Sequence, residues 1–244
     1  MNIIRNDKII KRNTMIARYS MFGGLIVLMG GLFLSFRNPQ NFSLSMTALM
    51  VGFLLSQVGI FYANRWGRSP RPDEMIDAAL KGLDKKYSIY HYTTPAHHLL
   101  VGPSGVWIIL PYYQRGRISY SNGRWRQRGS NLYLKIFAQE GLGRPDMDIA
   151  SESEAVMKVL RRELPEESLP QIQAVLVFTN PRAVIEMPED ASPPAETVYL
   201  KDLKDTIRKS GKTKSMTLDR ITGIQEALGV IEKPVEEETA EEEE

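Results

Sequence analysis

The chain has 244 residues, a length that suits one domain with an appendage. Charged residues make up 25% and hydrophobic residues 43%, a globular composition that excludes a wholly disordered chain. The absence of cysteine excludes disulfide scaffolds, thiolate metal sites and cysteine nucleophiles. The net charge of +2 conceals a more basic body, because residues 234–244 carry seven glutamates and no Lys or Arg. We interpret residues 232–244 as a disordered acidic tail.

Two apolar stretches, about 17–36 and 42–63, dominate the N-terminal part of the chain. A membrane-spanning helix needs ~20 predominantly apolar residues, which both stretches supply. The first follows a basic segment, as in a signal peptide, but no small-residue cleavage site comes after it. We therefore interpret residues 1–64 as a basic segment followed by a transmembrane helical hairpin.

The basic residues around this hairpin predict its orientation. Only Arg37 lies in the turn between the two stretches. The remaining basic residues flank the hairpin on both sides: Arg5, Lys8, Lys11, Arg12 and Arg18 before it, and Arg65, Arg68 and Arg71 after it. We expect a two-pass protein of the cell membrane with both termini in the cytoplasm. Neither stretch contains Asp, Glu, Lys or His, which indicates an anchor and not a transport pathway.

Glycines recur at a spacing of seven residues within the hairpin, so that each pair lies on one helix face. The pairs are Gly23 and Gly30, Gly24 and Gly31, and Gly52 and Gly59. Small residues allow helices in lipid to approach closely. These faces could pack the hairpin together or form a homo-oligomer, although glycine is also simply common in membrane helices.

Residues 65–72 read as a linker, and residues 73–231 as one cytoplasmic α/β domain with a mixed sheet. Hydrophobic periodicity and turn signals predict the elements of this domain. The expected helices are Asp73–Leu83, Glu152–Leu164, Asp202–Ser210 and Thr217–Leu228. The expected strands are Tyr87–Tyr92, His98–Val101, Val106–Leu110, Ile118–Tyr120, Arg124–Arg128, Ile172–Phe178 and Thr197–Leu200. Asn122-Gly123 is the strongest short hairpin signal among them.

The stretch His97–Ile109, with its Gly-Pro-Ser-Gly turn and apolar strand, resembles the nuclease-related (NERD) family. Gly116-Arg117-Ile118 and Trp125 fit the hairpin that follows in that family. The resemblance implies a fold similar to the restriction-endonuclease-like nucleases. It places Glu74 at the family's early glutamate and Asp148 near the polar position that precedes the later helix.

The same resemblance implies that the nuclease site is degenerate. The family's aspartate falls on His97, its glutamate on Leu110 and its lysine on Tyr112. The chemistry needs acidic metal ligands and a lysine, and neither Leu nor Tyr supplies these groups at neutral pH. We expect no catalytic residues and no cofactor. The alternative is a metal-dependent nuclease with a relocated site that uses the residual acids Glu74 and Asp148.

A metal site built from histidines is not expected either. All three histidines, His91, His97 and His98, lie close together in the sequence. Adjacent residues of a strand point to opposite faces, so His97 and His98 should not converge.

The most suggestive surface is a basic hairpin without acidic residues between positions 115 and 128. We identify six candidate binding residues there: Arg115, Arg117, Arg124, Trp125, Arg126 and Arg128. Arginine binds phosphate and aromatic rings stack on bases, which suggests nucleic acid as a partner. A membrane-tethered domain could instead contact anionic lipid. A third interpretation is a solvated face, shared by Arg124, Arg126 and Arg128, that covers a buried Trp125.

The sequence therefore predicts a membrane-anchored, catalytically inactive NERD-like domain that binds an anionic partner or a protein. The alternatives are a nuclease with a relocated site and a membrane scaffold that assembles through the glycine faces.

Overall fold

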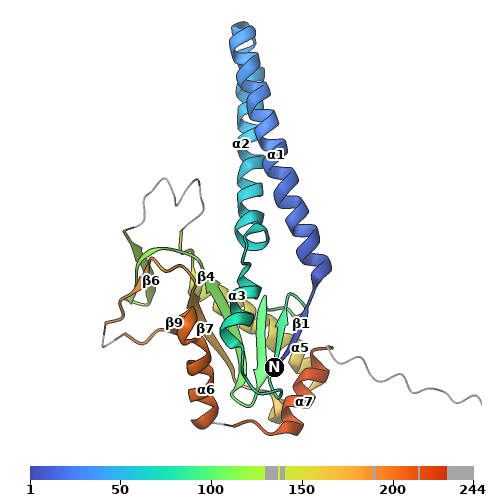
Figure 1. Ribbon diagram of the computed structural model, residues 1–244, viewed down its shortest axis with the longest axis vertical. Coiled ribbons are helices and arrows are strands. Elements are labelled where there is room, and N and C mark those ends of the chain that lie inside the picture. Colours follow the sequence, from blue (N-terminus) through green and yellow to red (C-terminus); the bar gives the residue numbers. More distant parts are fainter. Residues whose placement is uncertain (130–136, 138–140, 189–190, 214, 230–244) are drawn as a thin grey trace, which may run out of the picture.

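A computed structural model describes residues 1–129, 137, 141–188, 191–213 and 215–229. The predicted acidic tail lies outside the described residues. A long pair of helices stands on a mixed α/β domain, as Figure 1 shows. This arrangement confirms the predicted α/β class and the mixed sheet.

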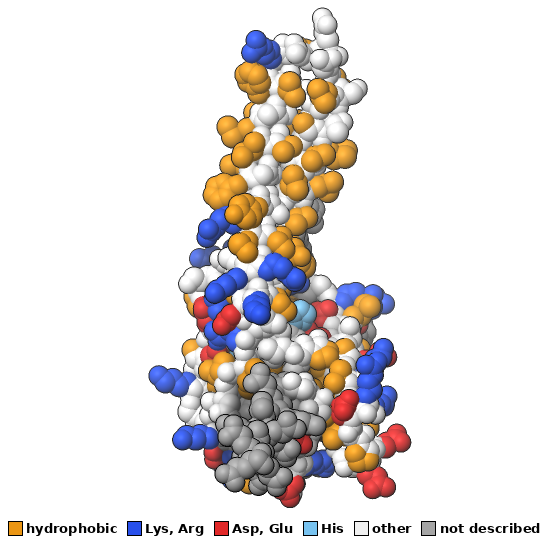
Figure 2. Space-filling view, turned by 90° about the vertical axis from the view of Figure 1, so that its right-hand side faces the viewer, with side chains coloured by type: hydrophobic (Ala, Val, Ile, Leu, Met, Phe, Trp, Pro, Cys, Tyr) orange, Lys and Arg blue, Asp and Glu red, His pale blue; other side chains and the backbone are white. Residues whose placement is uncertain are grey.

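The helix pair consists of α1 (Asp7–Arg37) and α2 (Phe42–Tyr62), joined by a short 3-10 turn at Pro39–Asn41. Both helices are long and apolar enough to cross a membrane. Helix α1 begins earlier than predicted because the Asn6 side chain accepts a hydrogen bond from the Ile9 N–H and caps it. Most large apolar side chains of the pair point outward, as the orange side chains in Figure 2 show.

Four glycines bring α1 and α2 together. A Cβ atom on Gly24 would lie 2.8 Å from the Ser56 nitrogen, and one on Gly52 would lie 2.8 Å from the Leu28 nitrogen. Equally short distances exist at Gly59, and Gly31 lies against Ala48 and Leu49. Gly23 and Gly30 face away, with no atom within 4 Å of a Cβ placed on them. The contact between α1 and α2 is therefore formed by the faces that carry Gly24, Gly31, Gly52 and Gly59.

The main sheet has six strands in the order β1-β2-β3-β4-β7-β9. The strands are β1 (Asn2–Arg5), β2 (Ser88–His91), β3 (His98–Gly102), β4 (Gly105–Tyr112), β7 (Ile172–Phe178) and β9 (Glu196–Tyr199). Strand β3 is antiparallel to both of its neighbours, β2 and β4. The other pairs are parallel: β1 with β2, and β7 with both β4 and β9.

Strand β1 was not predicted and changes the domain boundary. Residues 2–5 were assigned to the basic segment of the hairpin, but they form an edge strand of the domain sheet. The Arg5 side chain fixes this strand through ion pairs with the carboxylates of Asp73 and Asp77 on α3. The helix pair is therefore inserted within the domain, between β1 and α3.

Helices cover both faces of the sheet. Helices α5 (Pro145–Glu163) and α7 (Leu218–Ala227) pack on one face, and α3 (Pro72–Leu80) and α6 (Leu203–Thr213) pack on the other. Alternate residues of β4 point into the hydrophobic cores on the two faces of the sheet. Ile108 packs in the core under α5 and α7, and Ile109 packs in the core under α3 and α6. The predicted linker is partly helical, because a π turn over Ala63–Gly67 extends α2 before α3 begins.

A second sheet of three strands stands at the side of the domain. Strands β6 (Arg124–Arg128) and β5 (Gly116–Ser121) form the predicted hairpin, with Asn122 and Gly123 both at positive φ in its turn. The third strand, β8 (Ala183–Ile185), was not predicted. Figure 1 shows this sheet at the end of the domain from which α2 rises. The Phe137 ring reaches Phe53 of α2, with 6.1 Å between ring centroids.

Candidate functional site

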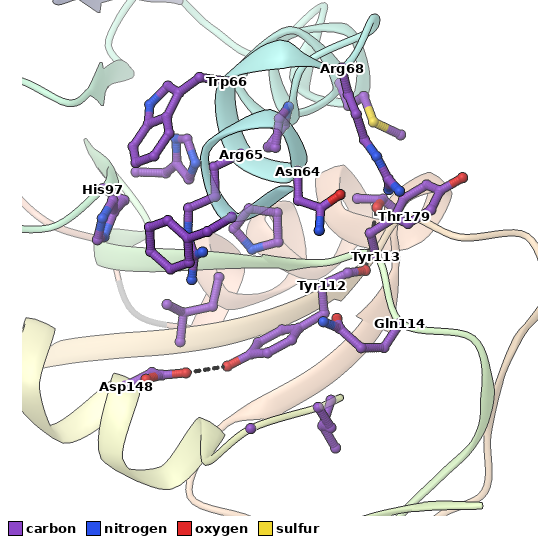
Figure 3. Close-up of a pocket in the computed structure, with 18 of the residues that line it drawn as sticks. Asn64, Arg65, Trp66, Arg68, His97, Tyr112, Tyr113, Gln114, Asp148 and Thr179 are labelled. Carbon is purple, nitrogen blue, oxygen red and sulfur yellow. Dashed lines mark hydrogen bonds between the residues drawn. The ribbon is translucent and has the colours of Figure 1, made fainter. Parts of the chain in front are cut away.

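A pocket of about 770 Å³ lies where the lower end of α2 meets the sheet. Its upper wall comes from Phe61 and the π turn, and its lower wall from the end of β4 and the start of α5. Figure 3 shows the side chains of these elements pointing toward a common space. The volume falls within the range of about 300–1,000 Å³ that is typical of ligand sites.

Two arginines form the upper wall. The Arg65 guanidinium lies 3.9 Å from the centre of the Phe61 ring, and the Arg68 guanidinium lies 3.9 Å from the centre of the Tyr113 ring. Neither forms a salt bridge with any carboxylate in the described part of the chain. Each arginine is thus held by an aromatic ring, which leaves its N–H groups available for an anion.

Two carboxylates form the lower wall, and each is oriented by one neighbour. Asp148 and Glu152 are four residues apart on α5, so they share one helix face. The Tyr112 hydroxyl donates to Asp148 over 2.8 Å (Figure 3). The Nδ1 atom of His97 lies 2.6 Å from Glu152 Oε1, and the His97 backbone N–H donates to Glu152 Oε2 over 3.3 Å.

The surroundings of these groups shift their pKa values. Burial and the neighbouring Asp148 charge raise the pKa of Tyr112, so its hydroxyl stays protonated and remains a donor. The hydrogen bond to Glu152 raises the pKa of His97, which favours the imidazolium form. The pocket therefore combines two arginines above with Asp148 and the His97–Glu152 pair below.

The structure gathers most of the positions that the NERD resemblance singles out. His97, Leu110, Tyr112 and Asp148 all line this pocket. Glu74 does not, because its Oε2 accepts the Arg71 backbone N–H over 2.9 Å and caps α3 instead. The two residual acids thus do not meet in the pocket. Among the described residues, no group of three or more His, Asp or Glu side chains is arranged to hold a metal ion.

Two of the three histidines contact each other, and the third pairs with a carboxylate. His97 pairs with Glu152, whereas the Nδ1 atoms of His91 and His98 lie 2.8 Å apart, and His91 Nε2 lies 2.9 Å from Asp77 Oδ1. Burial and the neighbouring His91 lower the pKa of His98 well below its ordinary value. His97 and His98 thus have different hydrogen-bond partners, although both rings contact Tyr92 and both residues line the pocket.

The basic hairpin presents an exposed face that we call the arginine face. It consists of Arg117, Ser119 and Ser121 on β5 and Arg124, Arg126 and Arg128 on β6, and all four arginines are exposed. Trp125 points the other way, is only 8% exposed and packs edge-on against Tyr120. Arg115 precedes β5, and its carbonyl accepts a hydrogen bond from the Gln127 side chain. The hairpin thus offers charge without an exposed indole.

Sequence reasoning missed three residues of the pocket. It treated Arg65 and Arg68 only as signals of membrane orientation, and it did not single out Glu152. The spacing of four residues between Asp148 and Glu152 on a predicted helix was the available signal.

Comparisons with known proteins identify no relative of this chain. No family model matches it, and neither curated proteins nor solved structures give a significant match.

Proposed function

We propose that this protein is a membrane-anchored binding module in which α1 and α2 span the bilayer and the arginine face binds anionic lipid headgroups at the cytoplasmic surface. The domain is a degenerate, non-hydrolytic member of the NERD family with a restriction-endonuclease-like fold.

The outer surface of the helix pair supports insertion into a bilayer. Ile26, Phe33 and Leu54 are more than half exposed, which an aqueous setting would penalise. A core helix of a soluble protein would bury such side chains, and the buried residues of α2 are only Ser45, Gly52 and Gly59. The basic residues on both flanks support a cytoplasmic position of the domain.

The pocket geometry supports a domain without nuclease activity. Nuclease chemistry requires acidic ligands for a divalent metal, but Leu110 and Tyr112 occupy two of the family's core positions. Asp148 and Glu152 are engaged by Tyr112 and His97. The order of α3, the antiparallel strands, α5 and β7 supports the family's fold.

The burial of Trp125 behind the exposed arginine face is the observation that favours lipid over nucleic acid as the partner. Binding of single-stranded nucleic acid combines cationic side chains with exposed aromatic rings that stack on bases. The hairpin supplies only the cations, which suits a surface of phosphate groups.

The position of the second sheet favours the bilayer as that surface. Phe137 contacts Phe53, which lies nine residues before the end of α2, about 13 Å along a helix axis. The position of Phe137 at this height along α2 favours a placement of the second sheet beside the headgroups.

A fluorophore at Ser119→Cys in the full-length protein tests the proposal, because the chain has no native cysteine. We expect nanodiscs that contain phosphatidylglycerol to shield the label from an aqueous quencher. Pure phosphatidylcholine discs should not shield it, and added salt should remove the effect. The triple variant Arg124→Gln, Arg126→Gln, Arg128→Gln should lose the shielding. The matched control Lys158→Gln, Arg161→Gln, Arg162→Gln removes equal charge from α5 and should keep it.

Equal shielding in both kinds of disc would overturn the proposal. Saturable binding of duplex DNA that disappears in the β6 triple variant would assign the arginine face to nucleic acid instead. Cleavage of that DNA in the presence of Mg²⁺ would restore the nuclease alternative.

A further inference from the structure

The charges of the pocket are arranged in two layers along the axis of the helix pair. Arg65 lies in the π turn that follows α2, and Arg68 comes directly after that turn, on the side of the proposed bilayer. Asp148 and Glu152 come from α5, deeper in the domain. Figure 3 shows Arg65 reaching down from its helix and Asp148 at a lower level, extending sideways to the Tyr112 hydroxyl. A ligand that approaches from the bilayer meets the cations first and the carboxylates second.

We propose that this pocket binds the headgroup of an aminophospholipid, a lipid whose phosphate carries a primary ammonium group of the ethanolamine type. In such a lipid the phosphate lies next to the glycerol and the ammonium lies farther from the bilayer. The phosphate is placed between Arg65 and Arg68, and the ammonium at Asp148 and Glu152. This inference rests on the membrane placement of the proposed function but not on the arginine face.

Each wall retains hydrogen-bonding capacity for this ligand. A guanidinium has five N–H donors and binds phosphate with two of them, and stacking on Phe61 or Tyr113 leaves its edge free. An ionised carboxylate can accept about four hydrogen bonds. Tyr112 uses one site on Asp148, and His97 uses two on Glu152. Acceptor sites therefore remain for the three N–H donors of a primary ammonium.

Phe61 supplies a route from the bilayer into the pocket. This side chain lines the pocket, yet it is 39% exposed on the surface of α2. A lipid can thus place its headgroup in the pocket while its acyl chains lie along α2 in the bilayer. The whole lipid need not be extracted from the membrane. Soluble metabolites have no need of an opening beside an apolar helix.

The lower wall predicts discrimination among phospholipids. A choline headgroup has no N–H to donate, so it would leave the free acceptor sites of Asp148 and Glu152 unpaired. A glycerol headgroup has no cation to pair with Asp148, the carboxylate that lacks a histidine partner. Phosphate contact at the upper wall is common to all three headgroups, so selectivity should depend on the acids alone.

Native mass spectrometry of the full-length protein tests this inference. The protein is released from nanodiscs that contain equal amounts of phosphatidylethanolamine, phosphatidylcholine and phosphatidylglycerol with identical acyl chains. We expect one retained phosphatidylethanolamine per chain, at about tenfold excess over each other lipid, the difference made by one or two charge-assisted hydrogen bonds. Soluble O-phosphoethanolamine should displace it, and inorganic phosphate at the same concentration should not.

Three variants separate the two walls. Asp148→Asn keeps an oxygen acceptor for the Tyr112 hydroxyl but removes the charge, and it should abolish most of the excess while the fold survives. Arg68→Gln should lower retention of all three lipids to a similar degree. Arg161→Gln, an exposed α5 residue outside both the pocket and the arginine face, should leave retention unchanged. Thermal unfolding of each variant checks its fold.

Several outcomes would overturn the inference. Equal retention of the three lipids or no retained lipid would exclude an aminophospholipid site. A preference for phosphatidylglycerol that persists in the Arg124→Gln, Arg126→Gln, Arg128→Gln variant would exclude it too, because that variant lacks three of the four arginines of the arginine face. Displacement by inorganic phosphate alone would reduce the pocket to a phosphate site. A full-length chain that is soluble without detergent would refute the membrane placement itself, and lipid retention need not then be measured.

Discussion

The contact between His97 and Glu152 makes a prediction about pH that belongs to single residues. Glu152 raises the pKa of His97 in the folded protein, so the pair stabilises the fold fully below the unfolded value of about 6.5. That stabilisation is lost as the pH rises through the raised pKa. It should amount to no more than about 1 kcal/mol, because the His97 side chain is 55% exposed and solvent screens the pair.

Imidazole NMR of the full-length protein measures this directly, since the chain has only three histidines. We expect His97 to titrate above its ordinary pKa, and Glu152→Gln to bring it down. His98 should stay neutral to well below that value, because burial and the neighbouring His91 oppose its charge. A His97 titration that Glu152→Gln leaves unchanged would show that the contact does not form in solution.

At the scale of elements, local patterns predicted most of the domain. The buried run Ile172–Phe178 and the Asn122-Gly123 turn are local signals, and both elements formed with the predicted partners or bounds. Strands β1 and β8 have four and three residues, too few for a periodic signal, and their pairing depends on distant segments. The pocket was predictable only in part, because the family pattern marks the β4 positions but not Arg65 or Arg68.

Arg5 joins strand β1 to α3, so the loss of its side chain should lower the stability of the domain. Its partner Asp73 is fully buried and also binds Arg71, and Asp77 is a second partner. Arg5→Ala leaves a buried carboxylate with only one cation, which should destabilise the domain by about 2 kcal/mol. Thermal unfolding of the purified full-length protein should show a lower midpoint. The exposed Lys8→Ala change is the control, and an equal midpoint for both variants would contradict the role of β1.

At the scale of the whole molecule, the helix pair carries two kinds of glycine face. Gly24, Gly31, Gly52 and Gly59 face the opposite helix, whereas Gly23 and Gly30 face outward. Assembly through the inward faces would require the pair to separate. The outward face is the one from this set that another copy could use without disturbing the hairpin.

Substitution of one glycine from each face distinguishes these roles. Gly52→Val places its Cβ 2.8 Å from the Leu28 backbone nitrogen and should destabilise the helix pair by about 1–3 kcal/mol, the usual cost of overpacking. Gly30→Val meets no atom within 4 Å and should leave the unfolding midpoint in detergent nearly unchanged. Cross-linking in membranes provides the second measurement. If Gly30→Val removed cross-linked dimers while Gly52→Val kept them, the outward face would join two copies. If both variants gave the wild-type cross-linking pattern, neither glycine would contribute to a contact between copies. The role of Gly52 would then be confined to the contact between α1 and α2 of one chain, where its Cβ would clash with Leu28.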